Sequence, residues 1–287
     1  MVIVGTRRQP LVASMPSAVY GSMPIEDGHL VVSQEQADEL AVSDPTAASF
    51  LRRYVGAREM LYDLPRYCLW LDGASPSALR TSTFITDRMA KVKAFRAGSN
   101  RPATRTLAAT PSLFGERRQP TRPYVAIPKV SSQRRDYLPL AVLDASVIAS
   151  GSLILVASDD ALLAFGVLSS RVMTQWNAVV SGRMKSDFQF SIEVTYNNFP
   201  WPPLDDTSKA AIKAAAQAVL DTRAAHPDAT LADLYDPLVM PADLVKAHQA
   251  LDKAVLGLYG MKPSATDADV LAVLFERYLA ATTDTGE

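Results

Sequence analysis

The sequence predicts a mixed α+β fold followed by a small all-α helical bundle, and three observations lead to this prediction. Between Pro120 and Leu155, runs such as "YVAIPKV" and "SLILVA" are short, rich in β-branched residues and separated by turn residues, as strands are. Apolar residues spaced three and four apart elsewhere predict helices. After Pro203 the chain becomes rich in Ala and predicts helices alone. We therefore expect a lead-in linker over 1–32, a mixed α/β domain over 33–203 and a helical domain over 204–287.

Helix starts give the clearest local signals in the first part of the chain. The opening 30 residues are rich in Pro, Ser and Gly and predict irregular structure. Ser33 and Gln36 have the spacing of a capping box. Asp44 and Pro45 predict the N-cap and first position of a second helix, which we expect to continue to about Tyr54.

Later segments predict both helices and strands. "RYCLWL" is typical of a short strand, and "TSTFITDRMAKVKAFRA" of an amphipathic helix whose polar side carries Arg88, Lys91 and Arg96. Helices near 159–168 and 171–180 are followed by a candidate strand pair in "DFQFSIEV". The three C-terminal helices are expected in "DDTSKAAIKAAAQAVLDTRAAH", "PADLVKAHQALDKAVLGLYG" and "DADVLAVLFERYLAATT".

Composition limits the class of protein. With 48% hydrophobic and 21% charged residues, the 287-residue chain has the composition of a soluble globular protein. No apolar run approaches the roughly 20 residues that span a bilayer, and the amino terminus has no secretion signal, so a cytoplasmic protein is expected. Cys68 is the single cysteine, which excludes an internal disulfide and favours a small buried side chain.

Charge is unevenly distributed along the chain. From Arg80 to Arg135 there are thirteen basic and two acidic residues, a net charge of +11, whereas Leu204 to Glu287 has a net charge of −6. We call residues 80–135 the basic segment. Lys and Arg near phosphates release condensed counterions, so such a segment is typical of a protein that binds a polyanion. An ordinary solvated surface is the alternative.

The residues that usually carry catalysis are not grouped in the sequence. Asp159-Asp160 and Asp205-Asp206 stand at helix starts, where Asp caps exposed amides. The three histidines are scattered, no zinc-ligand spacing is present, and no nucleotide-binding loop or hydrolase motif occurs. Catalytic, cofactor-binding and metal-binding residues are therefore not expected in this chain.

The stretch "YNNFPWPP" contains the residue types of the Asn-Pro-Pro-Tyr/Phe motif of amino-methyltransferases, but in another order. No strand with a Gly-rich turn precedes it, so the sequence gives it no methyl-donor site. Consecutive prolines are instead typical of a junction between the strand-rich and the helical part.

Ten ordered blocks carry a family resemblance, among them "YGSMPIEDGHLVVS", "FLRRYVGAREML", "YVAIPKVSSQRRDYLPL", "GRMKSDFQFS" and "VTYNNFPWP". The chain resembles the carboxy-terminal third of the MmeI-like family of type II restriction-modification enzymes and adenine-specific DNA methyltransferases. The resemblance implies a target-recognition domain and a helical C-terminal domain that bind double-stranded DNA, without the nuclease or methyl-donor parts. It also implies that S-adenosylmethionine is used by a methyltransferase domain or chain outside this sequence.

Two further functions remain open from the sequence. One is a protein-interaction piece or truncated remnant that docks on a separate methyltransferase, and the other is a free-standing methyltransferase with an unrecognised donor site. As a recognition module, the chain is expected to have no activity alone and to be part of a site-specific, adenine-specific DNA methyltransferase.

The resemblance also implies site residues. Lys185 and Asp187 match a pair that contacts one base pair, and Gln189 lies near the bases. If Ser186 onward is extended, these three side chains share one face. Lys185 donating to guanine and Asp187 accepting from cytosine N4 would favour a G·C pair, whereas an exposed Lys/Asp ion pair is the alternative. The predicted base-contacting set also includes Ser152, and the predicted phosphate-contacting residues are Arg117, Arg118, Arg134, Arg135 and Lys129.

Overall fold

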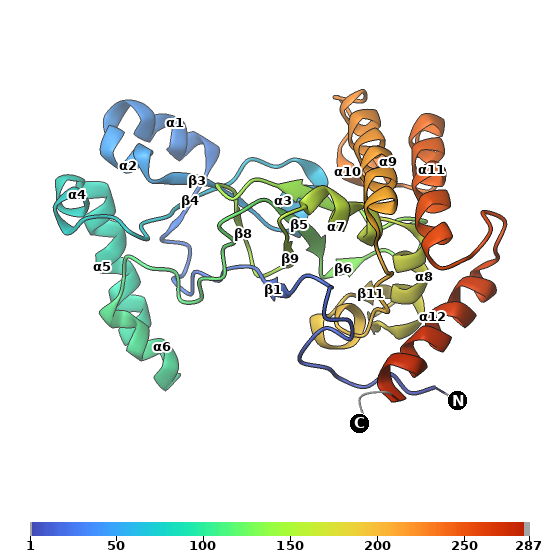
Figure 1. The fold of residues 1–287 in the computed structure, drawn as a ribbon. Helices are drawn as coiled ribbons and strands as arrows, with labels where there is room; N and C mark the ends of the chain where they lie inside the picture. Colours follow the sequence, from blue (N-terminus) through green and yellow to red (C-terminus); the bar gives the residue numbers. More distant parts are fainter. Residues whose placement is uncertain (1, 284–287) are drawn as a thin grey trace. The chain divides into compact units, whose positions relative to one another are not determined.

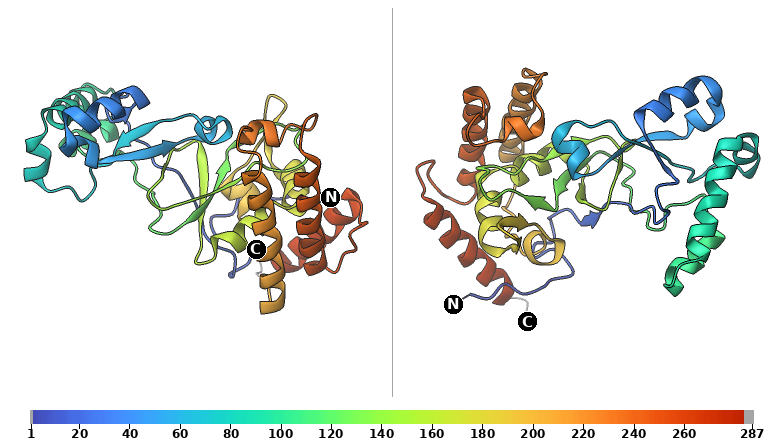
Figure 2. Two further views of the ribbon diagram at one scale, coloured as in Figure 1. Left: turned by 90° about the horizontal axis from the view of Figure 1, so that it is seen from above. Right: turned by 180° about the vertical axis from the view of Figure 1, so that it is seen from behind.

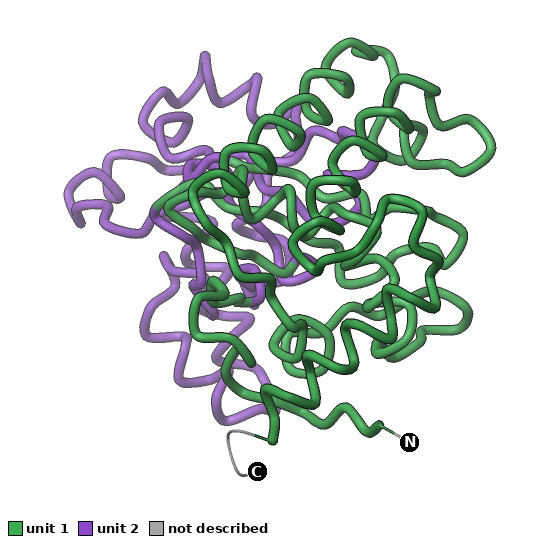
Figure 3. The backbone as a smooth tube through the Cα atoms, turned by 45° about the vertical axis from the view of Figure 1, so that its right-hand side comes forward, with its two compact units in different colours: residues 1–19, 122–143, 154–287 green, residues 20–121, 144–153 purple. Residues whose placement is uncertain are grey.

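The computed structural model describes residues 2–283 and has the expected mixed α+β fold with a helical C-terminal region (Figure 1). The chain forms two compact units, each assembled from segments far apart in the sequence (Figure 3). Unit 1 contains residues 1–19, 122–143 and 154–287, and unit 2 contains residues 20–121 and 144–153. The C-terminal helices thus belong to the same compact unit as part of the mixed α/β region, and the division into domains at Pro203 stays a prediction.

Unit 2 combines a four-stranded sheet with short helices. Its strands have the order β2-β4-β3-β8, antiparallel except for the parallel pair β3 and β8. Buried side chains including Leu30, Leu69 and Ile85 form its core. The elements are β2 (Val31–Val32), α1 (Gln34–Ser43), α2 (Pro45–Ser49), β3 (Leu51–Val55), α3 (Ala57–Tyr62), β4 (Tyr67–Leu69), α4 (Pro76–Thr81), α5 (Thr83–Ala97), α6 (Pro102–Thr106), a 3-10 turn (Leu107–Ala109) and β8 (Ile148–Ala149).

The first two helix starts are confirmed, but the end of the second was predicted wrongly. Ser33 and Gln36 form the capping box of α1, and the Asp44 carboxylate accepts a hydrogen bond from Ala47 N at 2.9 Å at the start of α2. The predicted helix to Tyr54 ends at Ser49, because Leu51–Val55 pairs with β4 on one side and β8 on the other. In the sheet, the N–H and C=O groups of Leu51–Val55 form interstrand hydrogen bonds, in place of the hydrogen bonds that a longer helix would give them.

Arg96 of α5 was predicted on the polar side of the helix and is instead fully buried. Its guanidinium donates hydrogen bonds of 2.7–3.0 Å to five backbone carbonyl oxygens. Three of these carbonyls lie in residues 107–113 and two at residues 24–25. Burial lowers the pKa of Arg96 from its usual value. The residue therefore holds two loops on α5, a role that the amphipathic pattern does not predict.

Unit 1 contains two sheets and the remaining helices. One sheet has the strand order β1-β9-β5-β7, and the other has the order β10-β11-β6. The expected strand pair in "DFQFSIEV" is strand only over its first residues, because the chain turns into a π-helical turn after Ser191. The elements are β1 (Ala18–Tyr20), β5 (Tyr124–Pro128), β6 (Val130–Ser131), β7 (Ala141–Leu143), β9 (Leu153–Ala157), α7 (Ala161–Leu168), α8 (Arg171–Val180), β10 (Gly182–Met184), β11 (Asp187–Gln189), the π-helical turn (Ile192–Tyr196), α9 (Asp206–Ala224), α10 (Leu231–Leu234), α11 (Ala242–Leu258) and α12 (Asp267–Thr283).

The C-terminal helices pack onto the rest of unit 1. Helices α9 and α11 run side by side (Figures 1 and 2), and α9 also packs on α7, where Gly166 permits close approach. A Cβ added at Gly166 would lie 2.5 Å from Ile212 Cγ2. Helix α12 packs on α8, with the Trp176 ring 5.4 Å from the Phe275 ring. No described helix has the length and apolar character required to cross a membrane.

Candidate nucleic-acid interface

The three-stranded sheet of unit 1 presents the predicted base-contacting residues. Strands β10 and β11 form an antiparallel hairpin, and β6 pairs with the other edge of β11. Phe188 is opposite Arg183 on β10 and Ser131 on β6 in the register, so these side chains share a face. Phe188 is buried, and the Arg183 guanidinium lies 4.3 Å from its ring centre. This face is therefore the packed face of the sheet.

The opposite face is the one available to a ligand. Asp187 and Gln189 flank Phe188 in β11 and so point away from the packed face. Asp187 is half-buried and Gln189 is exposed. Met184, opposite Asp187 in the register, has an exposed fraction of 51%. The expectation that Asp187 and Gln189 share a face holds in this geometry.

Lys185 was expected to share this face if the chain is extended from Ser186 onward, but the strand begins only at Asp187. Met184 pairs with Asp187, so Lys185 and Ser186 form the two-residue turn of the hairpin. Lys185 has φ of 59°, the left-handed region that a hairpin turn requires and that glycine usually occupies. Its exposed side chain therefore projects from the tip of the hairpin, next to the face that carries Asp187.

Basic side chains in unit 1 lie on the segments next to this hairpin. Lys129 immediately precedes β6 and is half-buried. Arg134 and Arg135 lie in the loop after β6, and the exposed Arg134 side chain forms no ion pair with another residue in the described range 2–283. The Arg183 guanidinium donates to Gln133 Oε1 at 3.0 Å in the loop and to Ser186 O at 3.2 Å in the turn. It thereby links the loop to the hairpin, a role the sequence did not indicate.

The other predicted phosphate-contacting arginines lie in unit 2 and have partners inside it. Arg117 forms a 2.8 Å ion pair with Asp72. Arg118 pairs with Glu116 and donates to Gly21 O at 3.1 Å. Both side chains keep a partly exposed surface, but each guanidinium already has an acceptor.

Ser152, also in unit 2, has an internal role. Its hydroxyl accepts a hydrogen bond from Ala57 N at 2.9 Å and lies 2.8 Å from Ser150 Oγ. Ala57 begins α3, whose N-cap residue Gly56 has no side chain to offer. Ser152 therefore caps this helix from a distant part of the chain, and its contact with a base stays a prediction.

The carboxylate pairs are used for capping and surface ion pairs. Asp160 accepts from Leu163 N at 3.1 Å at the start of α7, and Asp205 accepts from Ser208 N at 2.7 Å at the start of α9. Asp159 pairs with Arg122. Among residues 2–283, no three His, Cys, Asp or Glu side chains are grouped as metal ligands would be. Cys68 is buried, and burial raises the pKa of its thiol to about 12.

The "YNNFPWPP" segment binds residues 5–7 to the rest of unit 1. Asn197 and Asn198 are buried, with exposed fractions of 2% and 1%. Their side-chain amides donate 2.8 Å hydrogen bonds to the carbonyl oxygens of Arg7 and Gly5 respectively. These donors are occupied by the protein's own backbone, so the segment has a structural use in this chain.

Comparison with known proteins agrees with the geometry. A family model described as the MmeI target recognition domain matches residues 1–203, and one described as the MmeI C-terminal domain matches residues 204–285. The chain is 32% identical over 277 residues to DNA methyltransferase A of Bacillus subtilis (strain 168), across 96% of this chain and 31% of that protein. A solved structure of the type IIL restriction-modification enzyme MmeI in complex with DNA is similar at 38% identity and a TM-score of 0.92, across 98% of this chain and 37% of the other. The chain thus spans about a third of the length of these relatives.

Proposed function

The chain belongs to the MmeI family, and we propose that it is the part of such an enzyme that selects a short sequence in double-stranded DNA. The observation that carries this proposal is the β10–β11 hairpin, which presents Asp187 and Gln189 on one face and Lys185 at the adjoining turn. A two-stranded ribbon is narrow enough to enter the major groove of B-DNA, which is about 12 Å wide.

The hairpin side chains have the donors and acceptors that distinguish base pairs. The Lys185 ammonium donates to the O6 and N7 acceptors of guanine, and the Asp187 carboxylate accepts from the N4 amine of cytosine. Together they favour one orientation of a G·C pair. Gln189, two residues along the same face, has the amide that pairs with adenine N6 and N7.

Basic residues beside the hairpin supply the affinity that does not depend on sequence. In unit 1 we assign this role to Lys129, Arg134 and Arg135, because phosphate contacts fix the register of a protein on the duplex. Arg117 and Arg118 of unit 2 would have to share their guanidinium groups with the acceptors they already have. We also assign a base contact to Ser152, through whichever hydrogen-bonding capacity its capping role leaves free.

Methyl transfer belongs to the longer protein in this proposal. S-adenosylmethionine would bind a methyltransferase part outside these residues, which this chain would guide to its target. Such a recognition module acts where the DNA is, which in a bacterium is the cytoplasm.

Binding to duplex DNA at several salt concentrations tests the proposal. We expect fluorescence anisotropy to show that the logarithm of the association constant falls linearly with the logarithm of salt concentration. Selection from a random duplex pool should also enrich one motif. No binding at low salt would overturn the proposal.

Two controls separate the alternatives. Heat from titration of S-adenosylmethionine into the isolated chain would indicate a methyltransferase with its own donor site. Co-elution with a separate methyltransferase, without any affinity for DNA, would indicate a protein-interaction piece.

A further inference from the structure

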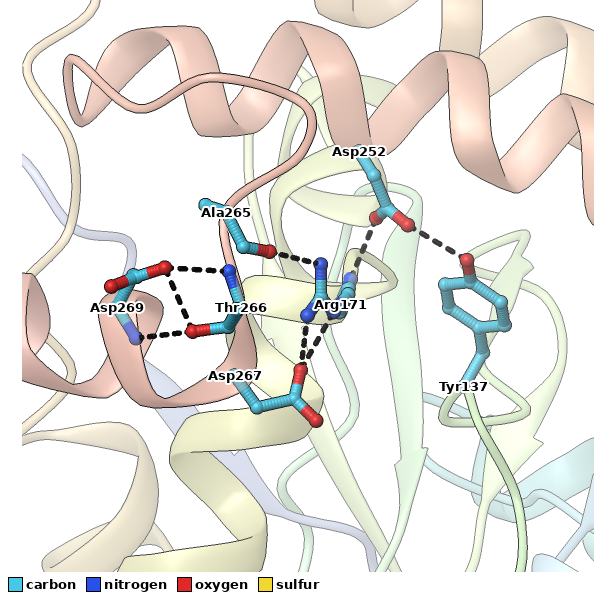
Figure 4. A network of polar contacts seen from close by, with 7 residues as sticks. All are labelled: Tyr137, Arg171, Asp252, Ala265, Thr266, Asp267 and Asp269. Atoms are coloured by element: carbon cyan, nitrogen blue, oxygen red, sulfur yellow. Dashed lines mark hydrogen bonds and ion pairs between the residues drawn. The ribbon is translucent and has the colours of Figure 1, made fainter.

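Tyr137, in the segment between β6 and β7, is held by the C-terminal helix α11 (Figure 4). Its ring stacks on the ring of His248, with 4.0 Å between ring centres and 21° between ring planes. Its hydroxyl donates a 2.7 Å hydrogen bond to Asp252 Oδ2. His248 and Asp252 are four residues apart on α11 and so lie on one side of it. Tyr137 itself is buried, with an exposed fraction of 8%.

The other carboxylate oxygen of Asp252 holds the start of helix α8. Asp252 Oδ1 accepts a 2.7 Å hydrogen bond from the backbone N–H of Arg171, the first residue of α8. The N-cap residue Ser170 makes no side-chain capping bond, so Asp252 performs this task from α11. Helix α8 ends at Val180, and β10 begins two residues later at Gly182.

A second link joins α8 to the start of α12. The Arg171 guanidinium donates to Asp267 Oδ1 at 2.8 Å and to Ala265 O at 3.0 Å, as Figure 4 shows. Thr266 and Asp269 exchange hydrogen bonds of 2.7–3.2 Å that fix this turn. The start of α8 is therefore held from two places in the C-terminal helical region.

Asp252 thus contacts both chain segments that flank the three-stranded sheet, the loop after β6 and the helix before β10. One oxygen fixes the loop that carries Arg134 and Arg135, and the other fixes the helix that leads into β10. Only 6% of Asp252 is exposed, and burial raises the pKa of its carboxyl group. A buried carboxylate opposes folding unless hydrogen bonds compensate, and the bonds from Tyr137 and Arg171 supply that compensation.

We propose that Asp252 and Tyr137 are positioning residues for DNA recognition, which hold the loop of residues 132–136 and strand β10 in the arrangement that meets the duplex. This inference rests on the proposed function. Under this proposal, the C-terminal helical region orients the DNA-contacting segments, although none of its own residues is assigned a DNA contact.

Removal of the Tyr137 hydroxyl is the first test, and the chain provides a matched control. Tyr259 is also a buried tyrosine whose hydroxyl donates one hydrogen bond, to Pro200 O at 3.0 Å, which lies neither in the loop of residues 132–136 nor in β10. We expect Y137F to weaken binding to the selected sequence roughly three- to tenfold, as loss of one hydrogen bond implies. Y259F should bind as the wild type does. Equal binding by Y137F and wild type, or an equal loss in Y259F, would overturn the proposal.

Substitutions of Asp252 provide the second test. The amide of D252N has one acceptor for Arg171 N–H and one donor for the Tyr137 oxygen, so both links can persist. We expect D252N to bind DNA within about threefold of wild type and D252A to lose about tenfold or more. Parallel losses in D252N and D252A would point to the charge itself and contradict a positioning role.

Hydrogen exchange on the free protein tests the link without DNA. In D252A, amides of residues 130–136 and 181–184 should exchange faster, while those of unit 2 stay unchanged. Unchanged exchange at these amides would overturn the proposal even if D252A bound DNA weakly. Wild-type protein that bound no DNA would refute the proposed function, and the exchange pattern would still decide whether Asp252 holds the sheet.

Discussion

Arginines of one basic segment serve different purposes in the two compact units. In unit 2, Arg96 donates to five backbone carbonyls, and Arg117 and Arg118 have carboxylate partners. In unit 1, the Arg134 side chain is exposed in the loop beside the hairpin. The net charge of +11 over residues 80–135 therefore overstates the charge available to a polyanion, because some of these arginines form hydrogen bonds or ion pairs within the protein.

The largest expected effect comes from the buried arginine. R96M would leave five carbonyl oxygens without their donor, each unsatisfied group costing about 1–3 kcal/mol, so we expect a loss of stability above about 4 kcal/mol. Urea unfolding measures it. The control is K91A on the same helix, where Lys91 forms a surface ion pair with Asp87, worth less than about 1 kcal/mol. Similar urea midpoints for R96M and K91A would show that the five hydrogen bonds of Arg96 contribute little to stability.

A pH difference between the units is expected next. His248 is buried in unit 1, and its pKa is lowered to about 3 by burial and by the Arg223 charge, whereas the His29 side chain in unit 2 is only half-buried. Below about pH 6.5 the His248 side chain is protonated in the unfolded chain but stays neutral in the folded one. The free energy of unfolding therefore decreases as pH falls from 6.5 towards 3.

Between pH 7 and pH 5 this proton should cost unit 1 about 2 kcal/mol. Hydrogen exchange at both pH values, corrected for the intrinsic rate, measures each unit separately. An equal change in unit 1 stability between the two pH values in wild type and in H248Q would contradict the burial of a neutral His248.

Salt dependence separates the arginines of the two units. R134A should lower the slope of log affinity against log salt by roughly one, as expected for one lost phosphate contact, and weaken all sequences alike. R117A should change the slope less, because Arg117 already has Asp72 as a partner. A larger change in R117A than in R134A would reverse the assignment between the units.

The smallest effect on stability concerns the hairpin tip. Lys185 has φ of 59°, a conformation that is strained for any residue with a Cβ. K185G should therefore keep or raise stability, by less than about 1 kcal/mol, and yet lose preference at one base pair. Thermal unfolding together with sequence selection checks both. A clear loss of stability in K185G would mean that the side chain is there for the fold.

Local signals in the sequence were sufficient for caps and for the fold class, but not for long-range contacts. The Ser33 capping box depends on residues three apart and was predicted correctly. Arg96 and the link between Tyr137 and Asp252 depend on partners up to 115 residues away, which periodicity cannot reveal. Period-two alternation predicts that Lys185 shares a face with Asp187, and this fails because Lys185 and Ser186 form a turn that lacks the usual Asn-Gly or Gly signal. Its assignment to bases came from the family resemblance and stays a prediction.

If Lys185 at the hairpin turn and Asp187 on the adjoining face select the base pair, an exchange of their charges will change the selected sequence. Wild type and the double variant K185E/D187R are each used to select bound sequences from a random duplex pool. We predict the same motif for both except at one position, where G·C changes to C·G, because donor and acceptor have exchanged places. The wild-type and variant proteins should bind nonspecific DNA almost equally. Identical motifs from the two proteins would contradict the claim.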